Sequence, residues 1–155
     1  MAYGTRELHK RLLIAQPVAG GAIYCSPPIK TDFVRYGTIH AISSSNTNTG
    51  GSLTVYGSNV YPTAQNGEAV DESESSRFAQ ALGVAKGGGT IGSLAALASV
   101  WLSTGLTLAI PNAAALNGAL ALNPFDYAWL LLVVAPTGAA TSMTLDAWLK
   151  MKSGA

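Results

Sequence analysis

The stretch Met143-Thr-Leu-Asp-Ala-Trp-Leu-Lys-Met-Lys152 decides the fold class, because its apolar side chains recur at every second position. In an extended chain these apolar residues share one face, and the opposite face is polar except for Trp148. Alternation of this kind is typical of a β-strand with one buried side. We therefore predict a strand over residues 143–152 with Leu145 in the core and Thr144 on the surface.

The segment before it, Asp126–Val134, is apolar on both faces of an extended chain. That pattern is typical of a central strand that is covered on both sides. The turn-rich residues Pro136–Thr141 separate the two segments, and we expect them to form a hairpin loop.

Shorter strands are predicted along the rest of the chain, separated by Gly, Pro, Asn and Ser residues. They span residues 12–15, 22–25, 35–42, 53–56, 106–110 and 119–122. Asn117-Gly118 is a tight-turn signal, and residues 43–51 form a polar loop. A short helix is expected near Ser75–Leu82, whereas Ser93–Leu102 has both helical spacing and strand character, which leaves its structure open.

Together these elements predict an all-β protein, an antiparallel β-sandwich or a jelly-roll-like variant with at most one or two short helices. Residues 31–155 form its single domain. Pro17 and Gly20-Gly21 interrupt the apolar runs near the N-terminus, so residues 1–30 are expected to form an extended arm that becomes ordered on a neighbouring subunit.

Charge is scarce in this chain: the charged residues make up 11% of its 155 residues, and the net charge is +1. A nucleic-acid partner is not expected, because no basic excess is present to neutralise phosphates. No charged residue occurs between Lys86 and Asp126, yet Gly, Pro and Asn punctuate this region too densely for a membrane-spanning helix. We expect neither a membrane span nor a signal peptide.

No residue pattern predicts catalysis, a metal site or a cofactor. Cys25, His9 and His40 lack the partners of a nucleophile or a zinc site. Gly87–Gly92 matches G-x-G-x-x-G without the strand and acidic residue that a dinucleotide site needs. The acidic stretch Glu68–Glu74 lacks the ligand spacing of a calcium loop. We therefore expect a protein that is not an enzyme.

Three segments carry a resemblance: Ser52–Asn59, which ends in Gly-Ser-Asn, Asp126–Val134, and the Pro136–Gly138 turn with the closing strand. Together they resemble small jelly-roll-like β-sandwich virion proteins of tailed bacteriophages, of the decoration or cement type. One departure is Val60, because similar elements often place an Asp after Gly-Ser-Asn. Discoidin-like carbohydrate-binding sandwiches share the same element.

The resemblance implies a capsid decoration protein that is made in the host cytoplasm and incorporated into the virion. Its partners would be the major capsid protein or other virion subunits, and a homotrimer is the favoured form. The low charge and high apolar content favour self-association independently.

Two sets of residues are candidates for contact with a partner. Cations of the arm would meet an acidic capsid surface, and its apolar run would lie on a neighbour. The candidate interface residues are Arg6, Lys10, Arg11, Leu12, Leu13, Ile14 and Trp148. In the alternative function, a carbohydrate-binding module, an exposed aromatic residue such as Trp148 or Tyr56 would stack on a sugar ring.

Overall fold

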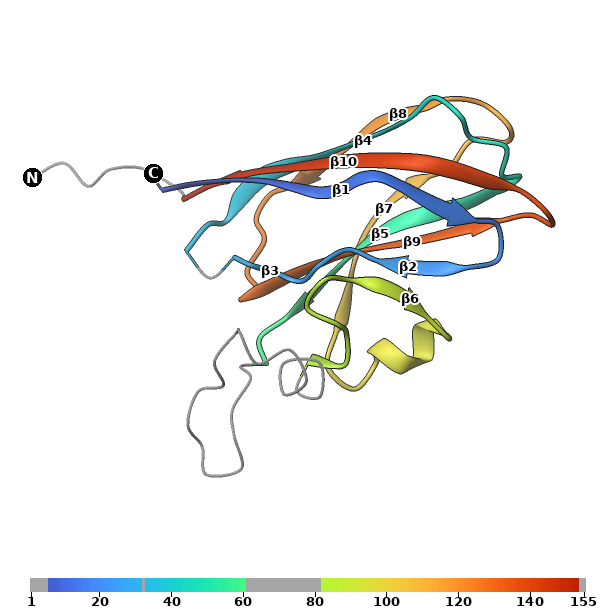
Figure 1. The fold of residues 1–155 in the computed structure, drawn as a ribbon. Helices are drawn as coiled ribbons and strands as arrows, with labels where there is room; N and C mark the ends of the chain where they lie inside the picture. The colour runs from blue at the N-terminus through green and yellow to red at the C-terminus, as the bar shows by residue number, and fades with distance from the viewer. Residues whose placement is uncertain (1–5, 32, 61–81, 154–155) are drawn as a thin grey trace, which may run out of the picture.

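The computed structural model describes residues 6–31, 33–60 and 82–153. Ten strands and one turn of 3-10 helix, η1, form the regular structure of these residues (Figure 1). The strands are β1 (Glu7–Ala19), β2 (Ile23–Cys25), β3 (Ile29–Lys30), β4 (Tyr36–Ser43), β5 (Gly50–Ser58), β6 (Gly89–Ile91), β7 (Leu102–Ala109), β8 (Leu116–Leu122), β9 (Trp129–Thr137) and β10 (Ser142–Lys152), and η1 spans Leu94–Leu97.

The strands form two antiparallel sheets that pack face to face as a sandwich (Figure 1). The four-stranded sheet has the order β1-β10-β4-β8. The six-stranded sheet has the order β6-β2-β9-β5-β7, with β3 also paired to β9. The prediction of an all-β antiparallel sandwich is confirmed.

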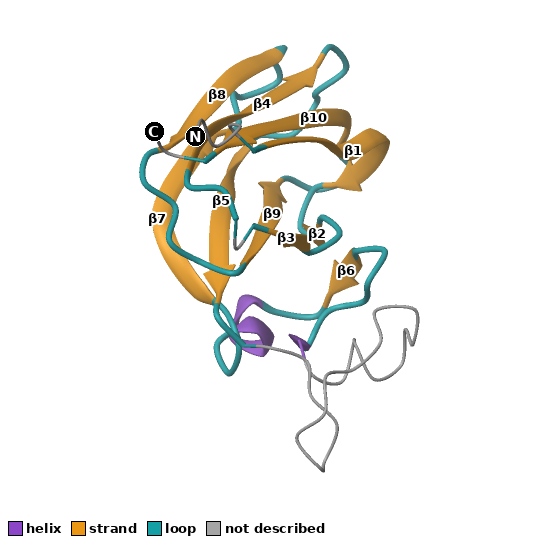
Figure 2. Cartoon of the chain, turned by 90° about the vertical axis from the view of Figure 1, so that its left-hand side faces the viewer, coloured by secondary structure: helices purple, strands orange, loops and turns teal. Residues whose placement is uncertain are grey.

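The pairing of the strands is nested: β1 pairs with β10, β2 with β9, β4 with β8, and β5 with β7. Pairing the first strand with the last and working inward is the connectivity of a jelly roll, in which a long antiparallel ribbon is rolled into two sheets. Strand β6 and η1 belong to the excursion between β5 and β7 and lie at the lower end of the molecule in Figure 2, where β6 pairs with β2 at the edge of the six-stranded sheet.

Two apolar clusters stabilise the fold, one on each side of the six-stranded sheet. The larger cluster fills the space between the sheets, and the smaller lies between the outer face of the six-stranded sheet and residues 82–101. Strand β9 contributes to both: Leu130 and Leu132 point into the first cluster, and Leu131 and Val133 into the second. The prediction of a strand covered on both faces is confirmed, although β9 begins at Trp129.

Strand β10 alternates strictly between buried and more exposed residues along its whole length. Leu145 is fully buried and Thr144 is exposed, as the sequence pattern predicts. Its central position, between β1 and β4, gives it a partner on either side.

The separate N-terminal arm predicted for residues 1–30 is wrong for the part that the structure describes. Residues 7–19 form edge strand β1, which pairs with β10 along most of its length. Leu12, Leu13 and Val18 are 2–3% exposed and belong to the main core. Pro17 is tolerated because an edge strand does not need every backbone N–H. Gly20 and the residue after it turn the chain toward β2.

Two predictions of connection type are also corrected. Residues 138–141 do not close a hairpin, because β9 and β10 belong to different sheets and this segment crosses between them. Asn117-Gly118 is not a turn, because both residues lie inside β8. A Cβ on Gly118 would approach the Leu108 methyl groups to 2.9 Å, so glycine serves the packing of β7 against β8 here.

The ambiguous segment Ser93–Leu102 contains the 3-10 turn and then Trp101, which is buried in the second cluster. The indole nitrogen of Trp101 donates a hydrogen bond to the carbonyl oxygen of Leu82 (2.7 Å). Of the helix expected near Ser75–Leu82, all but Leu82 lies outside the described residues. No helix within the described ranges is long and apolar enough to cross a membrane.

Candidate interaction surface

The outer face of the four-stranded sheet has an exposed tryptophan near its middle. Trp148 lies on β10, opposite Arg11 of β1 on one side and His40 of β4 on the other. The alternation of β10 directs Trp148 away from the core, and 37% of its surface stays exposed. A large aromatic side chain is therefore presented to solvent on a rigid sheet.

Two neighbouring side chains bracket the indole ring. The guanidinium carbon of Arg11 lies 4.9 Å from the ring centroid, within range of a cation–π interaction. The His40 ring lies 6.2 Å away from the indole, centroid to centroid, at an interplanar angle of 46°. Because these neighbours come from both adjacent strands, the orientation of Trp148 is set by the sheet register.

Hydrogen bonds fix the two bracketing side chains in turn. Asp146 Oδ1 accepts hydrogen bonds from Arg11 Nη2 (2.5 Å) and from the backbone N–H of Ala15 (2.9 Å). His40 Nε2 lies 2.6 Å from the side-chain oxygen of Asn117, within hydrogen-bond distance. The Ala15 N–H, and then Arg11, hold the pKa of Asp146 below its ordinary value.

A bulge in β1 explains why a backbone N–H is available to Asp146. The register of β1 against β10 shifts between Leu13 and Gln16, and Ala15 has a left-handed φ of 43°. The bulge turns Ile14 outward, where 65% of its surface is exposed. Bulges on edge strands also obstruct the addition of a further strand.

The structure separates the predicted interface residues into three groups. Arg11 and Trp148 are in direct contact, and Ile14 is exposed three residues beyond Arg11. Leu12 and Leu13 are in the core, so their assignment to a partner interface is wrong. The reason is a second register shift, between Arg11 and Leu13, which turns both leucines inward in succession where a regular strand would alternate.

Arg6 and Lys10 lie on the other side of Arg11 along the chain. The guanidinium carbon of Arg6 is 5.9 Å from the centroid of the Phe33 ring. Lys10 lines a cavity between β1 and β3. These two cations are exposed, as expected, but they are not part of the group around Trp148.

The two aromatic residues of the predicted sugar site lie on opposite outer faces of the sandwich. Tyr56 packs against the second cluster, beyond the six-stranded sheet, whereas Trp148 belongs to the four-stranded sheet. Tyr56 is also half-buried there. A single site that uses both rings is therefore excluded by the fold.

The residues weighed as nucleophile and base do not meet. Cys25 is 1% exposed in the second cluster, and burial raises the pKa of its thiol to about 11. His9 and His40 lie on the other sheet, where His9 is 3.2 Å from Glu7 Oε2. Within the described ranges, no three His, Cys, Asp or Glu side chains are grouped to hold a metal ion.

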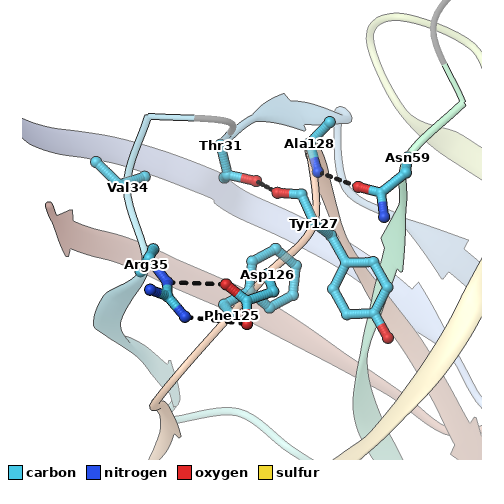
Figure 3. Close-up of a pocket in the computed structure, with 8 residues that line it drawn as sticks. All are labelled: Thr31, Val34, Arg35, Asn59, Phe125, Asp126, Tyr127 and Ala128. Carbon is cyan, nitrogen blue, oxygen red and sulfur yellow. Dashed lines mark hydrogen bonds and ion pairs between the residues drawn. The ribbon is translucent and has the colours of Figure 1, made fainter. Parts of the chain in front are cut away.

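A second feature, a cavity of about 270 Å³ at one end of the sandwich, is lined by the ion pair Arg35–Asp126 (Figure 3). The Arg35 Nε and Nη2 atoms lie 2.8 and 3.1 Å from the two Asp126 carboxylate oxygens. Thr31 Oγ1 donates a hydrogen bond to the Tyr127 carbonyl oxygen (2.8 Å). Asn59 Oδ1 accepts a hydrogen bond from the backbone N–H of Ala128 (2.8 Å). These polar groups hold the segment that leads into β9.

The Gly-Ser-Asn element of the sequence has its explanation at the same end. A Cβ on Gly57 would overlap the Tyr127 ring, so only glycine fits beside that ring. Ser58 Oγ donates to the carbonyl oxygen of Val100 (2.8 Å), and Asn59 holds the entry to β9. The element therefore fastens β5 to two other segments, which is a structural role.

Sequence reasoning missed Asp146 and Asn117 as members of the group around Trp148. Asp146 has a local signal, because it lies two residues before Trp148 and thus on the same face of the strand. Asn117 has none, because its contact with His40 depends on the pairing of β4 with β8.

Neither a protein-family model nor a curated protein matches this sequence. Among solved structures, the chain is similar to the VP2 chain of the infectious bursal disease virus subviral particle, at 11% sequence identity and a TM-score of 0.26. The alignment covers 96% of this chain and 41% of the VP2 chain. This is a weak structural match to a viral capsid protein, and it assigns the chain to no family.

Proposed function

We propose that this protein is a structural component of a virus particle, a capsid decoration or cement protein that stabilises the shell through subunit contacts. The observation that carries the proposal is the Trp148–Arg11 pair on the outer face of the four-stranded sheet. Its partner would be a neighbouring virion subunit.

The pair has the properties of an interface hot spot. Tryptophan and arginine are the residue types most enriched among side chains that dominate binding energy. Arg11 is held by Asp146, and Trp148 is bracketed by Arg11 and His40. Side chains that are already fixed lose little rotamer freedom when a partner docks, which favours association.

The fold and composition support the same class of function. Jelly rolls occur in viral capsids and also in lectins. The fold is therefore compatible with a capsid protein but does not by itself assign a function. The low charge, 11% of residues, favours burial of surface against neighbours. Because the sequence resembles phage virion proteins, we propose a homotrimer as the oligomeric state.

Sugar stacking is the competing use of Trp148. A pyranose ring needs an open indole face, but Arg11 and His40 come close to the indole from the strands on either side. This arrangement favours a protein partner, whose side chains can pack around the exposed part of the residue.

The test begins with particles purified from the source of the sequence. The protein is expected among their components by mass spectrometry, and its absence would overturn the proposal. Particles that lack the protein are then incubated with the wild type, Trp148→Ala, and the control Thr144→Ala on the same face of β10. Loss of a hot spot of 2 kcal/mol or more weakens binding by about 30-fold or more, whereas the control should bind as the wild type does.

Two further outcomes separate the parts of the proposal. Unchanged particle binding by Trp148→Ala would show that this face is not the interface. Light scattering after size exclusion is expected to give a trimer mass, and a monomer would remove the trimer. Binding to glycans that Trp148→Ala abolishes, with no binding to particles, would favour the carbohydrate-binding alternative.

A further inference from the structure

Four strands form the margins of the two sheets in the part of the chain that the structure describes. They are β1 and β8 in the four-stranded sheet, and β6 and β7 in the six-stranded sheet. Figure 2 shows β8 and β1 at opposite margins of their sheet. An edge strand directs the backbone N–H and C=O groups of every second residue away from its neighbour, so it can pair with a strand of another chain unless something prevents this.

Three of these four edges are obstructed. Strand β1 has two register shifts against β10 and contains Pro17, and β6 is only three residues long. Strand β7 has a register shift at Gly105, whose φ of 79° is left-handed. The hydroxyl groups of Ser103 and Thr104 accept hydrogen bonds from the backbone N–H groups of Gly105 and Leu106. Bulges, prolines and short edge strands are means by which proteins prevent the addition of a further strand.

Strand β8 is the regular edge. Residues Leu116–Leu122 pair with β4 without a register shift and include neither a proline nor a charged residue. The exposed side chains of β8 are small, since they are Asn117, Ala119 and Ala121. Strand β7 approaches β8 from the core side through Leu108, and within the described residues the outer edge of β8 pairs with no other strand. The backbone groups on this edge are therefore available to a partner strand.

The surroundings of this edge are uncharged. No charged residue occurs between Lys86 and Asp126, a range that contains β7, β8 and the connection between them. The connecting residues 112–115 are exposed. A charged partner strand would find no opposite charge here, whereas a second copy of the same edge brings no charge to desolvate. The backbone pattern of an antiparallel edge is also complementary to itself across a two-fold axis.

We propose that β8 forms a two-fold interface with a second copy of this chain, in which the two β8 strands pair antiparallel and join the two four-stranded sheets into one continuous sheet. In a register centred on Ala119, Leu116 would lie opposite Leu122 of the partner subunit. The leucines of both copies would then line one continuous inner face. This inference does not depend on the proposed virion role, and a two-fold contact does not by itself form the proposed trimer.

The first test follows the mass of the full chain by analytical ultracentrifugation as the protein concentration rises. A two-fold contact doubles the mass of the form that is present at low concentration, whether monomer or trimer, and we expect this doubling. Ala119→Lys places two lysines opposite each other at the centre of the pair, and it should raise the dissociation constant for doubling by about tenfold or more. The matched control is Thr38→Lys, an exposed position on the same face of β4, one strand further in, which should leave that constant unchanged.

Cysteine cross-linking tests the register. In the centred pairing the two copies of residue 119 face each other with Cβ atoms about 4.5–5.5 Å apart, from which a small shift reaches disulfide distance. Mild oxidation of Ala119→Cys is therefore expected to give a covalent dimer, and the control Thr38→Cys should give none. The native Cys25 is buried and should not contribute.

Any of three results would overturn the proposal. These are the absence of mass doubling up to about millimolar concentration, equal weakening by Ala119→Lys and Thr38→Lys, and equal cross-linking of Ala119→Cys and Thr38→Cys. If the lysine at position 119 disturbs folding, which circular dichroism would show, the comparison of the two cysteine variants decides.

Discussion

Removal of β1 is expected to unfold the protein, because this strand supplies part of the main core. Leu12, Leu13 and Val18 are each at most 3% exposed. Full burial of such a side chain contributes about 1.5–3 kcal/mol, so the three together contribute roughly 5–9 kcal/mol. The whole stability of a domain is about 5–15 kcal/mol. A chain that begins at Gly21 should therefore lose most or all of its stability.

Circular dichroism and thermal denaturation of the truncated and full-length chains measure this effect. A single substitution gives a finer test: Leu13→Ala should cost about 2–5 kcal/mol. At about 2–4 °C per kcal/mol for a chain of this size, its Tm should fall by roughly 5–20 °C. The control is the exposed neighbour, Ile14→Ala, which should stay within about 0.5 kcal/mol of the wild type. A truncated chain that melts cooperatively within a few degrees of the full-length protein would refute the assignment of β1 to the core.

Three more predictions concern single residues. Leu145→Asp should unfold the protein, because it buries a carboxylate without a partner, and Thr144→Asp should change the free energy of unfolding by about 1 kcal/mol or less; equal denaturation curves would contradict the facing of β10. The Cys25 thiol, with its pKa raised to about 11 by burial, should not react with a thiol reagent at pH 8 until the protein is denatured, and rapid labelling of the native protein would contradict its burial. Because folding lowers the pKa of Asp146, the contribution of this carboxylate to the free energy of unfolding should be complete above the unfolded value of about 3.9 and should be lost as the pH falls through the lower folded value. Urea denaturation should therefore show Asp146→Asn to be less stable than the wild type at pH 6 and equally stable at the lowest pH, and a difference that does not shrink as the pH falls would contradict this.

Local sequence patterns predict those strands in which the pattern of buried and exposed side chains is regular along the chain. Strand β10 alternates without interruption, and β9 is apolar throughout because residues 82–101 cover its second face. Local patterns predict an arm in place of strand β1 because Pro17 and Gly20-Gly21 interrupt its apolar runs. The register shift between Arg11 and Leu13 also breaks the alternation, since it leaves Leu12 and Leu13 buried in succession. Whether β9 and β10 form a hairpin or cross between sheets depends on distant partners, which no local pattern contains.

The sequence predicts individual residues of the candidate surface but not the contacts between them. Its charge makes Arg11 a candidate, and its place on the polar face makes Trp148 one. Their contact depends on the register between strands at opposite ends of the chain. Alternation shows that Tyr56 and Trp148 point away from the main core, but it does not show that they lie on opposite faces of the sandwich. Long-range topology therefore decided most of the errors.

The nested pairing of strands also determines the order in which this protein is able to fold during synthesis. The central strand of the four-stranded sheet, β10, leaves the ribosome after every other strand described here, whereas its neighbour β1 leaves first. Until then β1 has no strand to pair with, and β4 is paired on one side only. Sheets whose paired strands are far apart in the sequence form slowly, and apolar surface stays exposed until the last strand is in place. A ribosome that stalls before residue 142 would therefore hold a nascent chain with Leu12 and Leu13 uncovered, and we expect chaperones to bind at that stage.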